Sequence, residues 1–348
     1  MRTFLHASLL VALVLAGCSG YIAWGDYGYC DPYYDPYCYD YGYGPWYPAS
    51  LAATDFDADG RLDLAVSDGQ NGSLWIVRGT EGGGLEDAPS AHLSFPAPDS
   101  AVAVVNADGD PRPDLLVLDA SPGTLTTYAG DGAGGFTALA TTALTAAFTP
   151  GALRFARGHL DGDAIDDIVL LDQGGAVHVA LGTGTGGFVD VGMGDPAAAF
   201  LGPDVTLRLP GVHLTLGDFD GEAGLDLLVL DGDRATLAVC SGHGDGTFGA
   251  PVTAAFASTQ PVLGVAAVTL GAGRPADVAL LSGARYDPYA QSSIGVVRAS
   301  DGGVVFEAKP VGTVRAITPY DLNGDGMTDL LLVDAVGHAI RTLHARRP

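Results

Sequence analysis

The feature that most constrains this chain is an acidic motif that returns every 51–59 residues. Its clearest copy, YDLNGDGMTDLLLVD at residues 320–334, alternates acidic or amide side chains with other residues and then enters a short apolar run. Six copies start at residues 55, 106, 159, 218, 269 and 321, and the eroded copy at 269 keeps only Asp277 of its acidic positions. Self-similarity at a fixed period predicts an array of equivalent units that fold as one body.

Each unit carries the signals of four short strands. In the second unit these strands are expected at residues 101–105, 114–119, 124–130 and 136–142, with the acidic motif as a loop between the first two. The second strand is apolar without alternation, as in LLVL and IVLL, so both of its faces should be covered. Four antiparallel strands packed between neighbouring sheets are typical of a β-propeller blade. The sequence therefore predicts an all-β chain with a six-bladed β-propeller of four-stranded antiparallel blades at residues 50–348.

The composition agrees with many tight turns and few helices, because 51 of the 348 residues are Gly. The net charge is −25, and a large share of the 41 Asp and Glu residues falls within the repeated motif. This concentration of acids predicts bound cations, and it argues against nucleic acid as a partner.

Residues 1–18 read as an export signal, with a basic start, an apolar run and a small-residue region that ends in Cys18. The ending LAGC resembles the lipobox of bacterial lipoproteins, which implies lipidation of Cys18 and an anchor in the outer membrane or at the cell surface. An ordinary cleaved signal with a coincidental cysteine is the alternative. The lipid would be the protein's contact with the membrane.

Residues 19–49 form a Tyr-rich, low-complexity segment between the signal and the repeats. Its sequence YCDPYYDPYC places Cys30 and Cys38 close enough for a disulfide, which an exported location permits. We interpret the segment as a tether, and an aromatic stalk that adheres to wall glycans or to a partner is the alternative.

The loop pattern D-x-[DN]-x-D-G-x-x-D before an apolar strand, together with GDGTFGAP at residues 244–251, resembles the FG-GAP or VCBS repeat. Integrin-α heads carry related blades. The last repeat ends after its third strand, near His344, and propellers of this kind commonly close with a strand from the other terminus. The resemblance therefore implies that residues before 50, either 21–24 or 43–47, supply the closing strand of the sixth blade.

The acidic loop has the donors of a calcium site. Side chains at positions 1, 3 and 5 can converge on one point, and the carbonyl of residue 7 and the Asp at position 9 would complete a cage of oxygens that suits Ca²⁺. The predicted ligands are Asp55, Asp57, Asp59, Arg61 (carbonyl) and Asp63 in blade one; Asn106, Asp108, Asp110 and Asp114 in blade two; Asp161, Asp163 and Asp167 in blade three; Asp218, Asp220, Glu222 and Asp226 in blade four; and Asp321, Asn323, Asp325, Met327 (carbonyl) and Asp329 in blade six.

The copies predict sites of unequal strength. Blades one and six should be strongest, because Gly60 and Gly326 at position 6 allow an unusual backbone angle. Blades two and four, with Pro111 and Ala223 there, should bind more weakly. In blade three, His159 at position 1 is a poor calcium ligand, so either that site is weak or the ring points away. Blade five should bind none.

We expect these cations to hold loops on one face of the propeller rather than to contact a ligand. On the opposite face, two long connections at residues 190–212 and 283–293 enter or lie within the adjacent blades four and five. Long connections often carry binding residues, although tolerated loop variation would explain them too. The predicted partner-binding residues are His213, Arg285, Tyr286, Asp287 and Tyr289.

These features predict a calcium-stabilised, lipid-anchored propeller that acts as a binding or adhesion module for a protein or glycan at the bacterial cell surface. A structural component of an envelope assembly is one alternative. A propeller lyase or hydrolase with a site in the central channel is another, because fold alone does not fix function. No serine lies in a nucleophile-elbow setting and no cysteine pairs with a histidine at an interpretable spacing, so we do not expect an enzyme.

Overall fold

The structure is a computed structural model that describes residues 48–345 with several gaps, and the statements below concern the described residues alone. Within that range the description leaves out residues 62, 69–72, 82–85, 87–89, 95–100, 120–122, 145–153, 173–175, 192–211, 259, 272, 285–288, 321–325 and 335–338.

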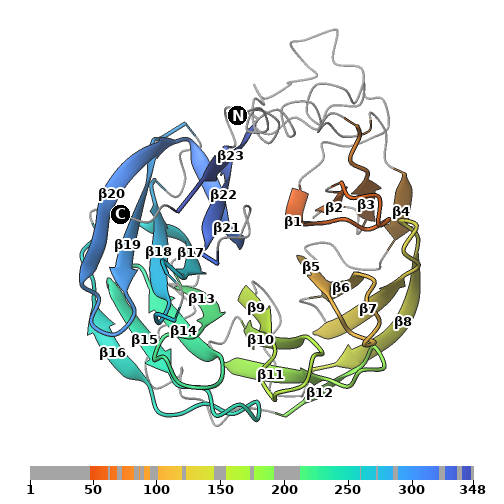
Figure 1. The fold of residues 1–348 in the computed structure, drawn as a ribbon, viewed down its shortest axis with the longest axis horizontal. Helices are drawn as coiled ribbons and strands as arrows, with labels where there is room; N and C mark the ends of the chain where they lie inside the picture. The colour runs from red at the N-terminus through yellow and green to blue at the C-terminus, as the bar shows by residue number, and fades with distance from the viewer. Residues whose placement is uncertain are drawn as a thin grey trace, which may run out of the picture.

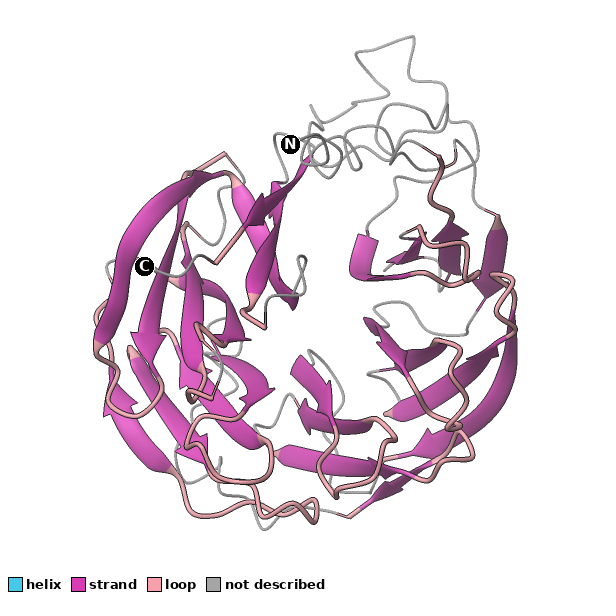
Figure 2. Cartoon of the chain, in the orientation of Figure 1, coloured by secondary structure: helices cyan, strands magenta, loops and turns pink. Residues whose placement is uncertain are grey.

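The described chain is built of short antiparallel strands grouped into six sheets around a ring (Figure 1). Figure 2 shows strands and loops throughout. Within each blade the strands follow chain order, with the first nearest the ring centre. The strands are β1 (Pro48–Thr54), β2 (Asp63–Asp68), β3 (Ser73–Val77) and β4 (Ala91–Ser94) in blade one; β5 (Ala101–Val105), β6 (Asp114–Asp119), β7 (Thr124–Gly130) and β8 (Phe136–Ala143) in blade two; β9 (Arg154–Gly158), β10 (Asp167–Leu171), β11 (Val177–Gly182) and β12 (Phe188–Asp190) in blade three; β13 (Val212–Gly217), β14 (Asp226–Asp231), β15 (Thr236–Cys240) and β16 (Val252–Ala255) in blade four; β17 (Val262–Val268), β18 (Asp277–Ser282), β19 (Ser292–Arg298) and β20 (Val304–Gly312) in blade five; and β21 (Val314–Tyr320), β22 (Asp329–Asp334) and β23 (Ala339–Leu343) in blade six.

The six-bladed all-β prediction is confirmed, and the second strands explain why. Every residue of β6, β10 and β14 is buried, as an apolar run without alternation requires. Each of these strands pairs on both sides, so that Val117 of β6 lies opposite Val102 of β5 and Thr126 of β7. The sheet satisfies the backbone polar groups, and neighbouring blades cover the side chains.

The core consists of apolar clusters that each join two successive blades. Between blades two and three, Leu116 and Leu118 pack with Ile168 and Leu170, all of them at most 2% exposed. Burying side chains of this size stabilises the fold by roughly 1.5–3 kcal/mol each. Corresponding clusters join blades one and two, three and four, four and five, and five and six, whereas none joins blades six and one among the described residues.

Blade six has three strands in the described chain, which is the count that the repeat predicted. The predicted closing segments at 21–24 and 43–47 lie outside the described residues, as do Cys18, Cys30, Cys38 and the whole tether. No helix in the described part of the chain is long and apolar enough to cross a membrane.

Candidate metal centre

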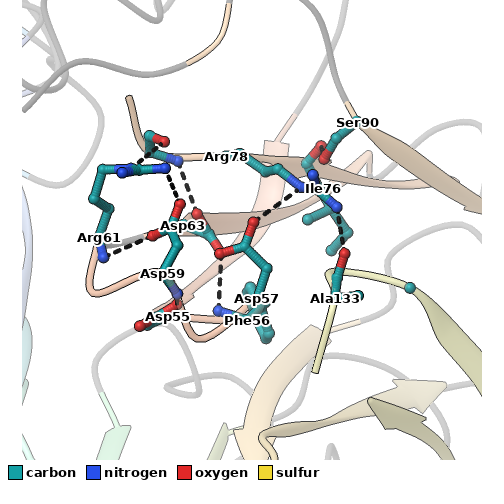
Figure 3. A network of polar contacts seen from close by, with 12 residues as sticks. Asp55, Phe56, Asp57, Asp59, Arg61, Asp63, Ile76, Arg78, Ser90 and Ala133 are labelled. Carbon is teal, nitrogen blue, oxygen red and sulfur yellow. Dashed lines mark hydrogen bonds and ion pairs between the residues drawn. The ribbon is translucent and has the colours of Figure 1, made fainter. Parts of the chain in front are cut away.

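In each blade the acidic loop connects the first strand to the second, and in blade one it wraps around the carboxylate of Asp55 (Figure 3). The backbone N–H of Asp59 donates to Asp55 Oδ1 at 3.1 Å, and that of Gly60 donates to Oδ2 at 2.7 Å. Gly60 has φ of 82° and Gly326 has φ of 77°, so the predicted unusual backbone at position 6 is confirmed. An acid at position 1 thus shapes the turn that brings the later acids back toward it.

Position 4 also requires a left-handed backbone, which the sequence analysis missed. Gly109, Gly162 and Gly221 occupy it in blades two to four with φ of 81°, 87° and 83°. Blade one has Ala58 there with φ of 58°, which an L side chain adopts only at a cost in free energy. The recurrence of Gly at position 4 in four copies of the sequence, Gly109, Gly162, Gly221 and Gly324, was the signal that could have revealed this.

The Asp at position 9 is a structural clamp as well as a potential metal ligand. In blade one, Asp63 Oδ2 accepts the N–H of Phe56 at 2.8 Å and Oδ1 accepts the N–H of Gly79 at 2.8 Å. These bonds tie the acidic loop, the start of the second strand and the end region of the third strand together. The equivalent clamps are Asp114 with Ala107 and Gly130, Asp167 with Leu160 and Gly182, and Asp226 with Phe219 and Gly242.

The clamp carboxylates carry an electrostatic cost. Burial raises the pKa of Asp63, Asp114, Asp167 and Asp226 above the usual value, and the backbone hydrogen bonds lower it in part. Neighbouring acids of the same loop raise it further. A bound cation would favour the ionised form of each group.

Three carboxylates converge in two of the loops. In blade one, oxygens of Asp55, Asp57 and Asp63 lie within 4.8 Å of one another. Oδ1 of Asp57 is buried and has no hydrogen-bond partner, so the loop presents an unsatisfied oxygen to the cluster. Hard carboxylate oxygens in this arrangement fit Ca²⁺. Blade four makes the same convergence with Asp218, Asp220 and Asp226.

The Asp at position 5 pairs with an arginine of its own loop in blades one and two. Asp59 forms an ion pair with Arg61, and Asp110 accepts a hydrogen bond from Arg112 Nε at 2.7 Å. In blade four, Glu222 stands apart from the three converging carboxylates. These three residues were predicted as ligands from spacing alone.

The predicted ligands of blades two and three accept hydrogen bonds within their own loops. In blade two, Asn106 Oδ1 accepts the N–H of Gly109 at 3.0 Å, and Asp108 Oδ1 accepts that of Asp110 at 3.0 Å. In blade three, His159 Nε2 lies 3.8 Å from Asp166 Oδ1 and its side chain is 53% exposed, while Asp161 and Asp163 accept backbone N–H groups within the loop.

In blade six, Asp329 is fully buried, and its Oδ1 accepts the N–H of Ala345 at 2.8 Å. Met327 is buried as well. Asp321, Asn323 and Asp325 lie outside the described residues. Blade five keeps the acid at position 9, Asp277, and has lost the acids of the other positions. Burial raises the pKa of Asp277, and the positive charges of Arg274 and Arg298 lower it in part.

The acidic loops also join neighbouring blades. Between blades two and three, four and five, and five and six, the carbonyl of position 1 accepts the N–H of position 8 in the next blade, as between Asn106 and Asp166 at 3.0 Å. The same bond links Asp218 to Ala276 at 2.5 Å. A cation that fixes an acidic loop would therefore also fix the contact between two blades.

The predicted partner patch is only partly described, and His213 needs a correction. His213 is 7% exposed, and its Nε2 lies 3.3 Å from the carbonyl oxygen of Val262 in the next blade. The ring is therefore buried between blades and does not belong to an exposed patch. Tyr289 is 55% exposed, whereas Arg285, Tyr286 and Asp287 lie outside the described residues.

Comparison with known proteins supports the repeat and the fold. The FG-GAP-like repeat family matches residues 55–117, which span most of blade one and the start of blade two. No curated protein matches the chain.

Three solved structures illustrate the likeness. A proposed 6-phosphogluconolactonase from Bacteroides uniformis has a TM-score of 0.53 at 15% identity, covering 85% of this chain and 80% of that one. The BP39L lectin from Burkholderia pseudomallei has a TM-score of 0.49 at 18% identity, covering 86% and 99%. The Tc holotoxin pore of Photorhabdus luminescens has a TM-score of 0.43 at 20% identity, and the match covers 81% of this chain but only 14% of the toxin chain. The first match supports the β-propeller fold and, at this identity, nothing further.

Proposed function

We propose that this chain is an exported, lipid-anchored β-propeller that binds Ca²⁺ in its acidic loops and serves as a binding or adhesion module at the bacterial cell surface. The observation that carries the proposal is the convergence of three carboxylates in blades one and four. The loop of blade four also bonds to blade five, through the carbonyl of Asp218 and the N–H of Ala276. Calcium there would stabilise the ring and keep its surfaces in one arrangement. Asp55, Asp57 and Asp63, and their equivalents in blade four, would hold the ion.

The N-terminal sequence supports the location. Cys18 would carry the lipid, and residues 19–49 would separate the lipid from the propeller. Mass spectrometry of the mature N-terminus tests this part, since a diacylated Cys18 is expected and an unmodified N-terminus beyond it would contradict the anchor.

The partner would be a protein or a glycan, and the net charge of −25 disfavours nucleic acid. Glycan and protein arrays probed with the purified chain test the binding role, once with Ca²⁺ and once with chelator. We expect specific binding that weakens in chelator because the ring loosens. A chain that binds nothing on either array in Ca²⁺ would contradict a binding function.

A further inference from the structure

A groove of about 570 Å³ lies between blades three and four, on the face that carries the acidic loops. This volume is within the range of small-molecule sites, roughly 300–1,000 Å³. One wall comes from the acidic loop of blade three, and the other from the acidic loop and the β15–β16 turn of blade four. The lining includes Glu222, Ala223, Gly224, Leu225 and His243.

The groove exists because blade four has no side chain at position 7 of its acidic loop. In blade three, Ile165 at position 7 fills the corresponding space, so closely that a Cβ on Gly109 or Gly184 would lie 3.3 or 3.6 Å from it. In blade two, Arg112 packs against Gly132 in the same way. The equivalent residue of blade four is Gly224.

The same space is filled further round the ring. At the seam of blades four and five, Pro275 at position 7 would lie 3.3 Å from a Cβ on Gly221. At the next seam, Met327 is 4% exposed. Among the described acidic loops, the absence of a plugging side chain is therefore particular to blade four.

The backbone fixes this opening. Gly224 has φ of 116°, and a Cβ on it would come within 3.0 Å of the carbonyl oxygen of Gly242. No other residue fits without movement of the turn, so the space at position 7 is a property of the fold here. The two walls are joined, because the N–H of Gly246 donates to the carbonyl of Leu160 at 2.9 Å.

One histidine in the groove has a fixed tautomer. Thr247 Oγ1 donates to Asp245 Oδ1 at 2.5 Å and must therefore accept from His243 Nδ1, which lies 2.9 Å away. Nε2 of His243 is then the unprotonated nitrogen of the neutral ring, and it can accept a hydrogen bond. Thr247 thus holds the imidazole of His243 in the tautomer whose Nε2 can accept a hydrogen bond from a hydroxyl group.

The lining combines groups that suit a sugar. The carboxylate of Glu222 and Nε2 of His243 can accept hydrogen bonds from hydroxyl groups, while Leu225 and Ala223 offer apolar surface. A pyranose presents hydroxyls at its rim and C–H groups on its face, so it matches both. The carboxylate of Glu222 repels anionic sugars.

We propose that the groove between blades three and four binds one neutral pyranose unit of a glycan, with His243 and Glu222 accepting hydrogen bonds from its hydroxyls. This rests on the proposed binding function and narrows it to a ligand class and a site.

Isothermal titration in Ca²⁺ tests the proposal with D-galactose, D-mannose, L-fucose, N-acetylglucosamine and, as an anionic probe, N-acetylneuraminic acid. At least one neutral sugar should bind and the anionic sugar should not. His243→Ala and Glu222→Gln should each lower the affinity about tenfold, because each removes a hydrogen-bond acceptor or its charge. His92→Ala on β4 and Glu307→Gln on β20 are matched controls that should leave the affinity unchanged. Equal melting temperatures would show that the variants are folded.

If His243→Ala and Glu222→Gln left neutral-sugar binding unchanged, the groove would not be the binding site, although the proposed binding function would still hold. A chain that binds no neutral sugar, or that binds only a lysine- or arginine-rich peptide at this site, would also overturn it. The proposed binding function would be contradicted only if the chain also bound nothing on the glycan and protein arrays.

Discussion

The acidic loops of blades one and four hold three carboxylates in the same arrangement, yet the two loops are balanced differently. In blade one, Arg78 Nε lies 3.3 Å from Asp57 Oδ2, and Arg61 pairs with Asp59 (Figure 3). Among the described residues, Asp218, Asp220 and Asp226 of blade four have no arginine or lysine partner. Blade one thus carries part of its counter-charge within the chain, whereas the described residues of blade four supply none.

This difference changes the ranking that the glycine at position 6 suggested. Gly60 makes the turn of blade one easier to form, but Arg78 already pairs with Asp57 and would compete with a cation for it. Ala223 at position 6 of blade four does not prevent the convergence of its carboxylates. The backbone preference at position 6 favours calcium binding in blade one, whereas the charge balance favours it in blade four. Substitutions in the two loops separate the two effects.

The largest effect should come from position 9 in either blade. Asp63→Ala or Asp226→Ala leaves two buried N–H groups without acceptors, and each such group costs about 1–3 kcal/mol. We expect the free energy of unfolding in urea to fall by about 3 kcal/mol for each variant in chelator. The fall should be larger in Ca²⁺, because each variant also loses a metal ligand. Asp59→Ala and Glu222→Ala at position 5 are the matched controls. Equal losses at positions 5 and 9 would show that the clamp has no special role.

The pH dependence without metal should be the next largest effect. Burial raises the pKa of Asp63, Asp114, Asp167, Asp226 and Asp277, so in chelator the folded chain binds more protons than the unfolded chain at mildly acidic pH. Its free energy of unfolding should therefore rise as pH falls from 7 through these raised values.

Below about pH 4, where unfolded Asp titrates, the trend should reverse. The exposed Asp110, Asp131, Asp245 and Asp301 have lowered pKa values, and their stabilising contributions are lost there. In saturating Ca²⁺, the same fall from pH 7 should instead destabilise the chain because protons displace the metal. Urea denaturation at a series of pH values, in chelator and in saturating Ca²⁺, checks this. The same pH dependence of the free energy of unfolding in both solutions would contradict the prediction.

Removing Arg78 should make blade one resemble blade four. Arg78→Met deletes the ion pair with Asp57 and the hydrogen bond to the carbonyl of Ala133, and it should cost about 1 kcal/mol in chelator. The rise in melting temperature on adding Ca²⁺ should become larger than in the wild type. Arg298→Met, at an exposed ion pair with Asp301 in blade five, is the control. An unchanged calcium response in Arg78→Met would contradict the competition.

The smallest effect should come from position 4 of blade one. Ala58 has φ of 58°, so Ala58→Gly relieves an unfavourable backbone and should raise the free energy of unfolding by up to about 1 kcal/mol. Ala223→Gly at a position without positive φ should lower it by about 0.5–1 kcal/mol through added unfolded-state entropy. Thermal melts of the two variants decide the point, and a loss at Ala58→Gly would refute the assigned strain.

The sequence allowed the blade count, the strand order and the loop positions to be predicted because each depends on a pattern repeated along the chain. The dual role of position 9 was less visible, since an acid in an acidic motif is naturally interpreted as a metal ligand. Asp277 offered a clue: it survives in the one copy that lost its other acids.

The features that could not be predicted depend on contacts between blades. The burial of His213 depends on Val262 of the next blade, and the pairing of Asp57 depends on Arg78, which lies beyond the loop. The groove depends on Gly224 being compared with Ile165 across a seam. Spacing within one repeat contains none of this information.

Titration of the metal-free chain with Ca²⁺ tests the central claim most directly. Calorimetry measures the binding, and thermal unfolding measures the change in melting temperature. We predict that Ca²⁺ binds and raises the melting temperature, and that Asp220→Asn removes more of that rise than Asp57→Asn. Both variants keep a side-chain oxygen and lose one charge, so the comparison isolates the carboxylate. Absence of calcium binding, with the same melting temperature in Ca²⁺ and in chelator, would contradict the account.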